Sequence, residues 1–218
     1  MSYTGAVVVS GPGDVRETTD LVITKVAVGS IDNNCYLLRC RATGEQLLVD
    51  AADEVPTLLA LAGDSGLASI VTTHCHWDHW RALGDMVTAT RARTFMGRDD
   101  AHEVPVPTDV LLDDEDVVRV GQVDLTVRHL RGHSPGSVAL IYRDPASFAH
   151  VFTGDSLFPG GVGNTQKDPR RFESLVHDVE SKIFDALPDD TWIYPGHGRD
   201  TTLGAERPHL ASWRARGW

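Results

Sequence analysis

The order of the predicted elements in this sequence indicates a layered α/β fold with two similar halves. Each half reads as several strands, then a helix, then a strand, and such helices cover the outer faces of sheets. The composition agrees, because 41% hydrophobic and 23% charged residues are near the average of globular domains. We expect one domain at 19–218, after an irregular lead-in at 1–18 that is rich in Gly, Pro, Ser and Thr.

In the first half, apolar runs predict four strands, at 21–28, 34–40, 46–49 and 67–72. Short polar turns separate the first three, which favours a meander. Helical spacing of apolar residues predicts a helix from Glu54 to Leu61, with Gly63 just past its end. The region after the fourth strand is expected to hold a short helix, a short strand, a loop or short helix, and an acidic turn, at 78–83, 87–90, 97–104 and 109–116.

In the second half, the pattern predicts four further strands, at 122–129, 137–142, 149–153 and 191–194. The clearest helix of the chain lies between the last two, because apolar residues recur at helical spacing from Phe172 to Leu187. Asp168 is a good N-cap for this helix, and Pro169 suits its first position. A closing helix is expected at 202–210.

A dense group of metal-binding side chains follows the strand at 67–72. The segment Thr73-His74-Cys75-His76-Trp77-Asp78-His79 holds three histidines and one aspartate within six positions. Extended backbone places His74 and His76 on one face, with Cys75 facing away, while Asp78 and His79 need a curled chain. This arrangement suits two adjacent metal ions better than one.

Three later strand ends carry further candidate ligands next to glycine. They are His133 in Gly132-His133-Ser134-Pro135-Gly136, Asp155 in Thr153-Gly154-Asp155-Ser156, and His197 in Pro195-Gly196-His197-Gly198. Sites in layered α/β folds gather at the carboxyl ends of strands. We therefore assign His74, His76 and His133 to one metal, and Asp78, His79 and His197 to another, with Asp155 bridging the two. Asp50, at the end of another strand, is expected to hydrogen-bond a ligand histidine.

The chemistry of this ligand set indicates two divalent metal ions. Imidazole and carboxylate ligands suit zinc, with iron or manganese as alternatives. Paired ions lie about 3.5–4 Å apart and share a hydroxide that attacks at neutral pH. Asp78 and Asp155 would orient this hydroxide, and Asp78 would relay a proton.

The segments HCHWDH, GHSPGS, TGDSLF and YPGHG, in this order, resemble those of the metallo-β-lactamase-fold hydrolases. The resemblance runs from about residue 34 to residue 207. It implies a four-layer αβ/βα sandwich of two mixed sheets with helices on the outer faces. It also implies a dinuclear site formed by the seven ligands named above.

Within that family, the sequence is most similar to the hydroxyacylglutathione hydrolase (glyoxalase II-like) branch, on Trp77 and the run from Gly154 to Phe158. This implies hydrolysis of a small-molecule thioester or ester. The loop after Phe158 departs from that branch, and we expect no helical extension for glutathione because the chain ends at Trp218. Another thiol carrier, a lactone or a small ester is therefore also considered.

Other functions of the same fold remain as alternatives. A non-haem iron oxidoreductase of the persulfide dioxygenase type has a similar sequence frame around one iron. A nuclease is disfavoured by the net charge of −11, because nucleic-acid binding usually needs a basic surface. The sequence leaves the oligomeric state open.

Four residues near the predicted site are candidates for contacts with an anionic or polar substrate: Asn164, Lys167, Arg171 and Tyr194. The sequence has neither a signal-peptide pattern nor a long apolar span, and it has three cysteines. We therefore expect a cytoplasmic protein without a membrane partner.

Overall fold

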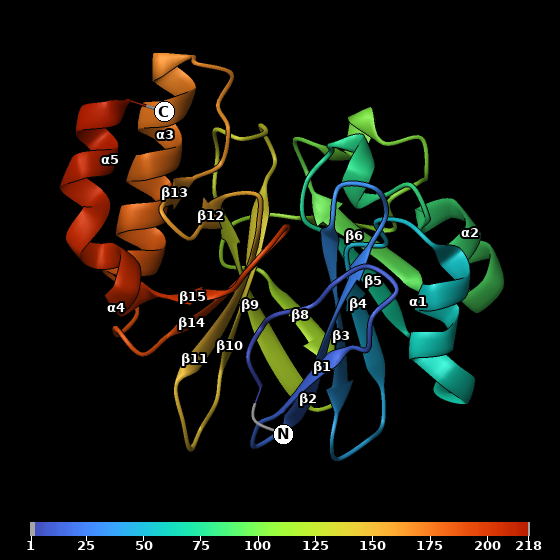
Figure 1. Cartoon of the computed structure of the whole chain (residues 1–218). Helices are drawn as coiled ribbons and strands as arrows, with labels where there is room; N and C mark the ends of the chain where they lie inside the picture. Colours follow the sequence, from blue (N-terminus) through green and yellow to red (C-terminus); the bar gives the residue numbers. More distant parts are fainter. Residues whose placement is uncertain (1–2, 218) are drawn as a thin grey trace.

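The computed structural model describes residues 3–217 and shows a helix–sheet–sheet–helix arrangement (Figure 1). Two β-sheets face each other in the middle. Helices α1 and α2 cover the outer face of the first sheet, and α3 and α5 cover that of the second (Figure 1). Among residues 3–217, no helix is long and apolar enough to cross a membrane.

The first sheet has seven strands whose spatial order follows the chain. Neighbours pair antiparallel from β1 to β4 and parallel from β4 to β7. Its strands are β1 Asp14–Glu17, β2 Leu21–Val28, β3 Asn33–Cys40, β4 Gln46–Val49, β5 Ser69–Thr72, β6 Arg93–Gly97 and β7 Val110–Leu112.

The second sheet has six strands in the order β15-β14-β11-β10-β9-β8. Only β11 and β14 pair in parallel, so this sheet is mixed as well. Its strands are β8 Val117–Val120, β9 Val123–His129, β10 Val138–Arg143, β11 Ala149–Gly154, β14 Trp192–Pro195 and β15 Thr201–Thr202, and β12 Leu157–Phe158 forms a separate hairpin with β13 Gly161–Val162.

The α-helices are short except for α3, which continues into a π-helical turn at Glu180–Phe184. They are α1 Val55–Ala62, α2 Leu83–Thr90, α3 Pro169–Val179, α4 Leu203–Glu206 and α5 Leu210–Arg216. Single 3-10 turns lie at Gly63–Ser65, Trp77–His79, Ala101–Glu103 and Arg207–His209.

Three apolar layers hold the sandwich together, because successive side chains of a strand point to opposite faces. In β4, Leu47 and Val49 pack between the two sheets, whereas Leu48 packs toward α1 and α2. In β10, Leu140 likewise faces the central layer and Ile141 faces α3 and α5. This burial on both faces explains why the strands read as continuous apolar runs.

The structure confirms the four-layer sandwich and most predicted elements. The strands at 21–28 and 46–49 match β2 and β4 in both bounds. The capped helix is also confirmed, since the Asp168 side chain accepts hydrogen bonds from the backbone of Arg170 and Arg171. The division into one domain after a lead-in stays a prediction.

Three local predictions were wrong, and one strand was missed. Residues 87–90 belong to helix α2, because Leu83 and Met86, three positions apart, are buried together against the first sheet. Two strands lie in regions predicted as irregular or turn-like: β1 within 1–18 and β7 within 109–116. Strand β6 was not predicted at all. Residues 1 and 2 of the lead-in lie outside the described residues.

Candidate metal centre

The loop after β5 is fixed by a buried carboxylate, that of Asp50. Asp50 follows β4 with φ 59° and is 1% exposed. It accepts hydrogen bonds from the backbone N–H of Thr73 at 2.7 Å and from the Thr73 hydroxyl at 2.8 Å. Its Oδ2 also lies 2.8 Å from Nδ1 of His79. Asp50 therefore anchors the start of the loop and orients a histidine near its end.

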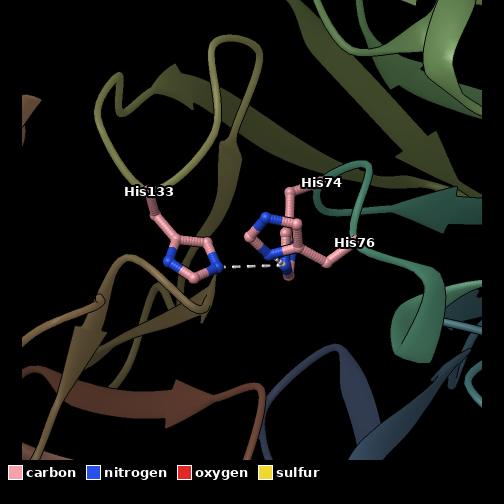
Figure 2. A group of neighbouring side chains, drawn as sticks. All are labelled: His74, His76 and His133. Atoms are coloured by element: carbon pink, nitrogen blue, oxygen red, sulfur yellow. Dashed lines mark hydrogen bonds between the residues drawn. The ribbon is translucent and has the colours of Figure 1, made fainter. Parts of the chain in front are cut away.

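Three histidine rings converge from two loops (Figure 2). Nε2 of His74 lies 3.1 Å from Nδ1 of His76 and 3.2 Å from Nε2 of His133. The other nitrogen of His133 donates to the backbone carbonyl of Asn164 at 2.9 Å. Burial lowers the pKa of all three rings, to about 4 for His133. The rings are thus neutral at pH 7, which is the form that binds metals.

A second group is formed by Asp78, His79 and His197. Oδ2 of Asp78 lies 3.4 Å from Nε2 of His79 and 3.2 Å from Nε2 of His197. The remaining nitrogen of His197 donates to the carbonyl of Ile31 at 3.0 Å. Each ring is thus held through one nitrogen while the other faces the group.

Asp155, at the end of β11, lies between the two groups. Its Oδ1 is 3.4 Å from Nε2 of His79. Its Oδ2 is 3.6 Å from Nε2 of His133 and 3.7 Å from Nε2 of His197. One carboxylate therefore reaches ligand atoms of both groups.

These residues fit metal ions. Nε2 of His79 and Oδ1 of Asp155 are buried, and neither has a hydrogen-bond partner among the described residues, a state that is costly unless a cation lies between them. Ligand atoms of a tetrahedral zinc lie about 3.3–3.6 Å apart, close to the distances given above. A Cβ atom at Gly196 would come within 2.2 Å of Oδ1 of Asp155, so glycine lets the His197 loop approach.

The local electrostatics also favour cations. Burial acts to lower the pKa of His79, but the carboxylates of Asp50 and Asp155 outweigh it and raise this pKa to about 9. Burial acts to raise the pKa of Asp78, but His197 and His79 hold it below its usual range. The Asp78 carboxylate is therefore ionised at neutral pH, and a metal ion can replace the proton that His79 binds.

The four predicted substrate contacts have different surroundings. The prediction of a substrate contact at Tyr194 was wrong, because this residue is fully buried and its hydroxyl lies 2.9 Å from Nδ1 of His150. The Arg171 guanidinium is engaged by the carbonyls of Gly132 and His133. The side chains of Asn164 and Lys167 are exposed, so both stay predictions.

Two residues at the site were not predicted from the sequence. Nδ2 of Asn33 donates to Oδ2 of Asp78 at 2.9 Å, and Asp100 hydrogen-bonds both histidine-bearing loops of Figure 2. Neither residue sits in a recognisable spacing pattern. Only the fold reveals them, because it places Asn33 beside Asp78, 45 positions away in the chain, and Asp100 beside Cys75, 25 positions away.

The fold and the site define a class of protein: a two-sheet α/β sandwich with clustered His and Asp side chains at one end of its strands. Comparison with known proteins makes the class specific. The model of the metallo-beta-lactamase superfamily matches residues 29–197. The chain therefore belongs to this superfamily.

Individual relatives agree with this assignment. The chain is 36% identical over 169 residues to a hydroxyacylglutathione hydrolase of Cereibacter sphaeroides, covering 76% of this chain and 62% of that one. It is 26% identical to ETHE1 from Myxococcus xanthus, with a TM-score of 0.77 over 88% of this chain and 84% of that one. It is 33% identical to TTHA1623 in a di-iron-bound form, with a TM-score of 0.69 over 84% and 96%. The chain thus spans under two thirds of the length of the hydroxyacylglutathione hydrolase.

Proposed function

We propose that this chain is a hydrolase that uses a dinuclear metal site to cleave a thioester or ester of a small molecule. The observation that carries the proposal is the position of Asp155 between two complete three-residue groups. The similarity to hydroxyacylglutathione hydrolases supports thioesters as substrates. The proposed ligands are His74, His76, Asp78, His79, His133, Asp155 and His197.

Bound divalent ions, zinc by preference with iron or manganese as alternatives, would lower the pKa of a shared water to near 7 and polarise the substrate carbonyl. The chain itself supplies orientation. The carboxylates of Asp78 and Asp155 would accept hydrogen bonds from the attacking water, and Asp78 would receive its proton. Asn33 fixes Asp78 by donating to its Oδ2, and Asp50 fixes the ring of His79.

Steady-state turnover on a panel of thioesters, lactones, β-lactams and phosphodiesters tests this function. We expect metal-loaded protein to hydrolyse thioesters, and the panel includes a glutathione thioester and thioesters of other thiols. His76→Ala should lower kcat/KM by more than about 100-fold, because it removes a ligand. His177→Ala, which changes an exposed histidine of α3, is the matched control and should leave turnover unchanged. Absence of turnover on both the thioesters and the lactones, or an active His76→Ala variant, would contradict the proposal.

A second candidate is a non-haem iron oxidoreductase of the persulfide dioxygenase type. The fold similarity to ETHE1 favours it. Metal analysis of protein purified without added metal separates the two candidates. One iron per chain together with oxygen consumption would establish the oxidoreductase, whereas two ions per chain with thioester turnover would establish the hydrolase. The substrate is a small molecule in both cases, and the cytoplasmic location stays a prediction.

A further inference from the structure

We infer that Asp100 is a positioning residue that holds the three-histidine group, His74, His76 and His133, in its metal-binding geometry. The inference rests on the proposed metal centre. Asp100 follows β6, is fully buried, and belongs to neither of the ligand loops. It is not adjacent in sequence to any proposed ligand.

The Asp100 carboxylate joins the two loops that carry these histidines. Its Oδ2 accepts from the backbone N–H of Cys75, between His74 and His76, at 2.9 Å. The same oxygen accepts from the hydroxyl of Ser134, the neighbour of His133, at 2.5 Å. Its Oδ1 accepts from the backbone N–H of Gly136 at 2.6 Å. A single buried side chain therefore fixes the distance between the loops.

The packing around Asp100 is as tight as its hydrogen bonding. A Cβ atom at Gly136 would come within 2.4 Å of the backbone nitrogen of Asp100. A Cβ atom at Gly97 would come within 1.9 Å of the carbonyl oxygen of Gly136. The segment from 97 to 100 thus lies directly against the His133 loop, and this loop cannot shift without moving Asp100.

Within residues 3–217, Asp100 makes no hydrogen bond to the second ligand group, which is formed by Asp78, His79 and His197. Asp78 and His79 are held by Asn33 and Asp50, and His197 by the carbonyl of Ile31. Loss of the Asp100 carboxylate should therefore weaken one ion selectively. A purely structural role would weaken both ions, or would lower stability without changing either.

The test is a competition titration of the metal-free chain with Zn²⁺ against a chelator. The Asp100→Asn change is made in two backgrounds, His197→Asn, which keeps the three-histidine group, and His133→Asn, which breaks it. Asparagine retains the shape of aspartate but presents an N–H₂ group to N–H and O–H donors. We expect Asp100→Asn to lower Zn²⁺ affinity about 10–100-fold in the His197→Asn background. In the His133→Asn background we expect no further loss.

Asp99→Asn is the matched control, because Asp99 is the exposed neighbour of Asp100, and it should leave both affinities unchanged. If circular dichroism shows that Asp100→Asn does not fold, Ser134→Ala replaces it, since it removes one bond to the same carboxylate. Ser134→Ala should weaken only the His197→Asn background, by a smaller factor. Equal losses in both backgrounds, or none in His197→Asn, would overturn the inference. A chain that binds two ions but hydrolyses neither thioesters nor lactones would contradict the proposed function alone.

Discussion

At the residue scale, Asp50 shows how one buried carboxylate serves both the fold and the site. It accepts two hydrogen bonds from Thr73 and lies against Nδ1 of His79. That contact keeps the proton of His79 on Nδ1, which leaves Nε2 able to bind a metal ion. The motif around His79 was predictable from the sequence, as was the role of Asp50 at a strand end. Asn33 and Asp100 were not, because nothing in their local sequence encodes their distant partners.

Replacing Asp50 by asparagine should weaken metal binding. Asparagine tolerates the left-handed backbone of this position, with φ 59°. Its amide N–H₂ would face the Nδ1–H of His79, so the ring proton would move to Nε2 and block that ligand atom. We expect a loss of about 10–100-fold in affinity for one ion, measured by competition with a chelator. Asp64→Asn, an exposed change in the same half, is the control, and an unchanged affinity in Asp50→Asn would refute this role.

His150 should make stability pH-dependent far from the metal centre. Burial lowers its pKa from 6.5 to about 4. Below pH 6.5 the unfolded chain therefore takes up a proton that the folded chain refuses, and stability falls as the pH drops toward 4. Between pH 6.5 and 4.5 this costs about 2 kcal/mol. Urea unfolding of the metal-free chain checks this effect. The loss of stability between pH 6.5 and 4.5 should be about 2 kcal/mol smaller in His150→Gln than in the unchanged chain. Equal losses in the two proteins would disprove the effect.

At the element scale, local signals and tertiary context contribute differently. Helix α3 was predictable because its cap, its first proline and its apolar stripe all agree. Helix α2 was not, because Val87, Thr88 and Thr90 favour a strand locally, while the burial of Leu83 and Met86 decides for a helix. The short edge strands β1 and β7 form because a neighbouring strand offers hydrogen bonds, which no local pattern reveals.

The N-cap of α3 gives a prediction at this scale. Asp168→Ala removes the acceptor for the N–H groups of Arg170 and Arg171 and should lower the free energy of unfolding by about 1 kcal/mol. Asp168→Asn still caps the helix and should change the free energy of unfolding by only a few tenths of about 1 kcal/mol. Denaturant titration of both variants checks the difference. Equal stabilities of the alanine and asparagine variants would show that the cap contributes nothing.

At the scale of the whole molecule, the proposed metal ligands come from both sheets. His74 to His79 follow β5 of the first sheet, while His133, Asp155 and His197 lie on loops of the second. The central apolar layer and the metal centre therefore join the same two halves. Bound ions should stabilise the folded chain as a unit, because the unfolded chain cannot assemble ligands so distant in sequence.

Removal of metal should accordingly lower the stability of the entire fold. At a metal concentration about 100 times the dissociation constant, binding contributes about 2.7 kcal/mol per ion. Chelation should lower the melting temperature in a single cooperative transition, measured by scanning calorimetry. The double variant His133→Asn with His197→Asn should lose most of this response. A melting temperature that does not depend on metal would contradict the proposed centre.

The division of ligands between the two sheets also bears on how the protein is made. Each of the two three-residue groups contains a residue from the second half of the chain, His133 or His197, and Asp155 between them also comes from that half. During synthesis, the histidines at 74, 76 and 79 leave the ribosome long before these partners exist. A nascent chain therefore has no complete group until residue 133 emerges and no complete pair of groups until residue 197 does. We therefore expect the full pair of ions to be acquired late, after residue 197 has emerged and most strands of the second sheet have been made.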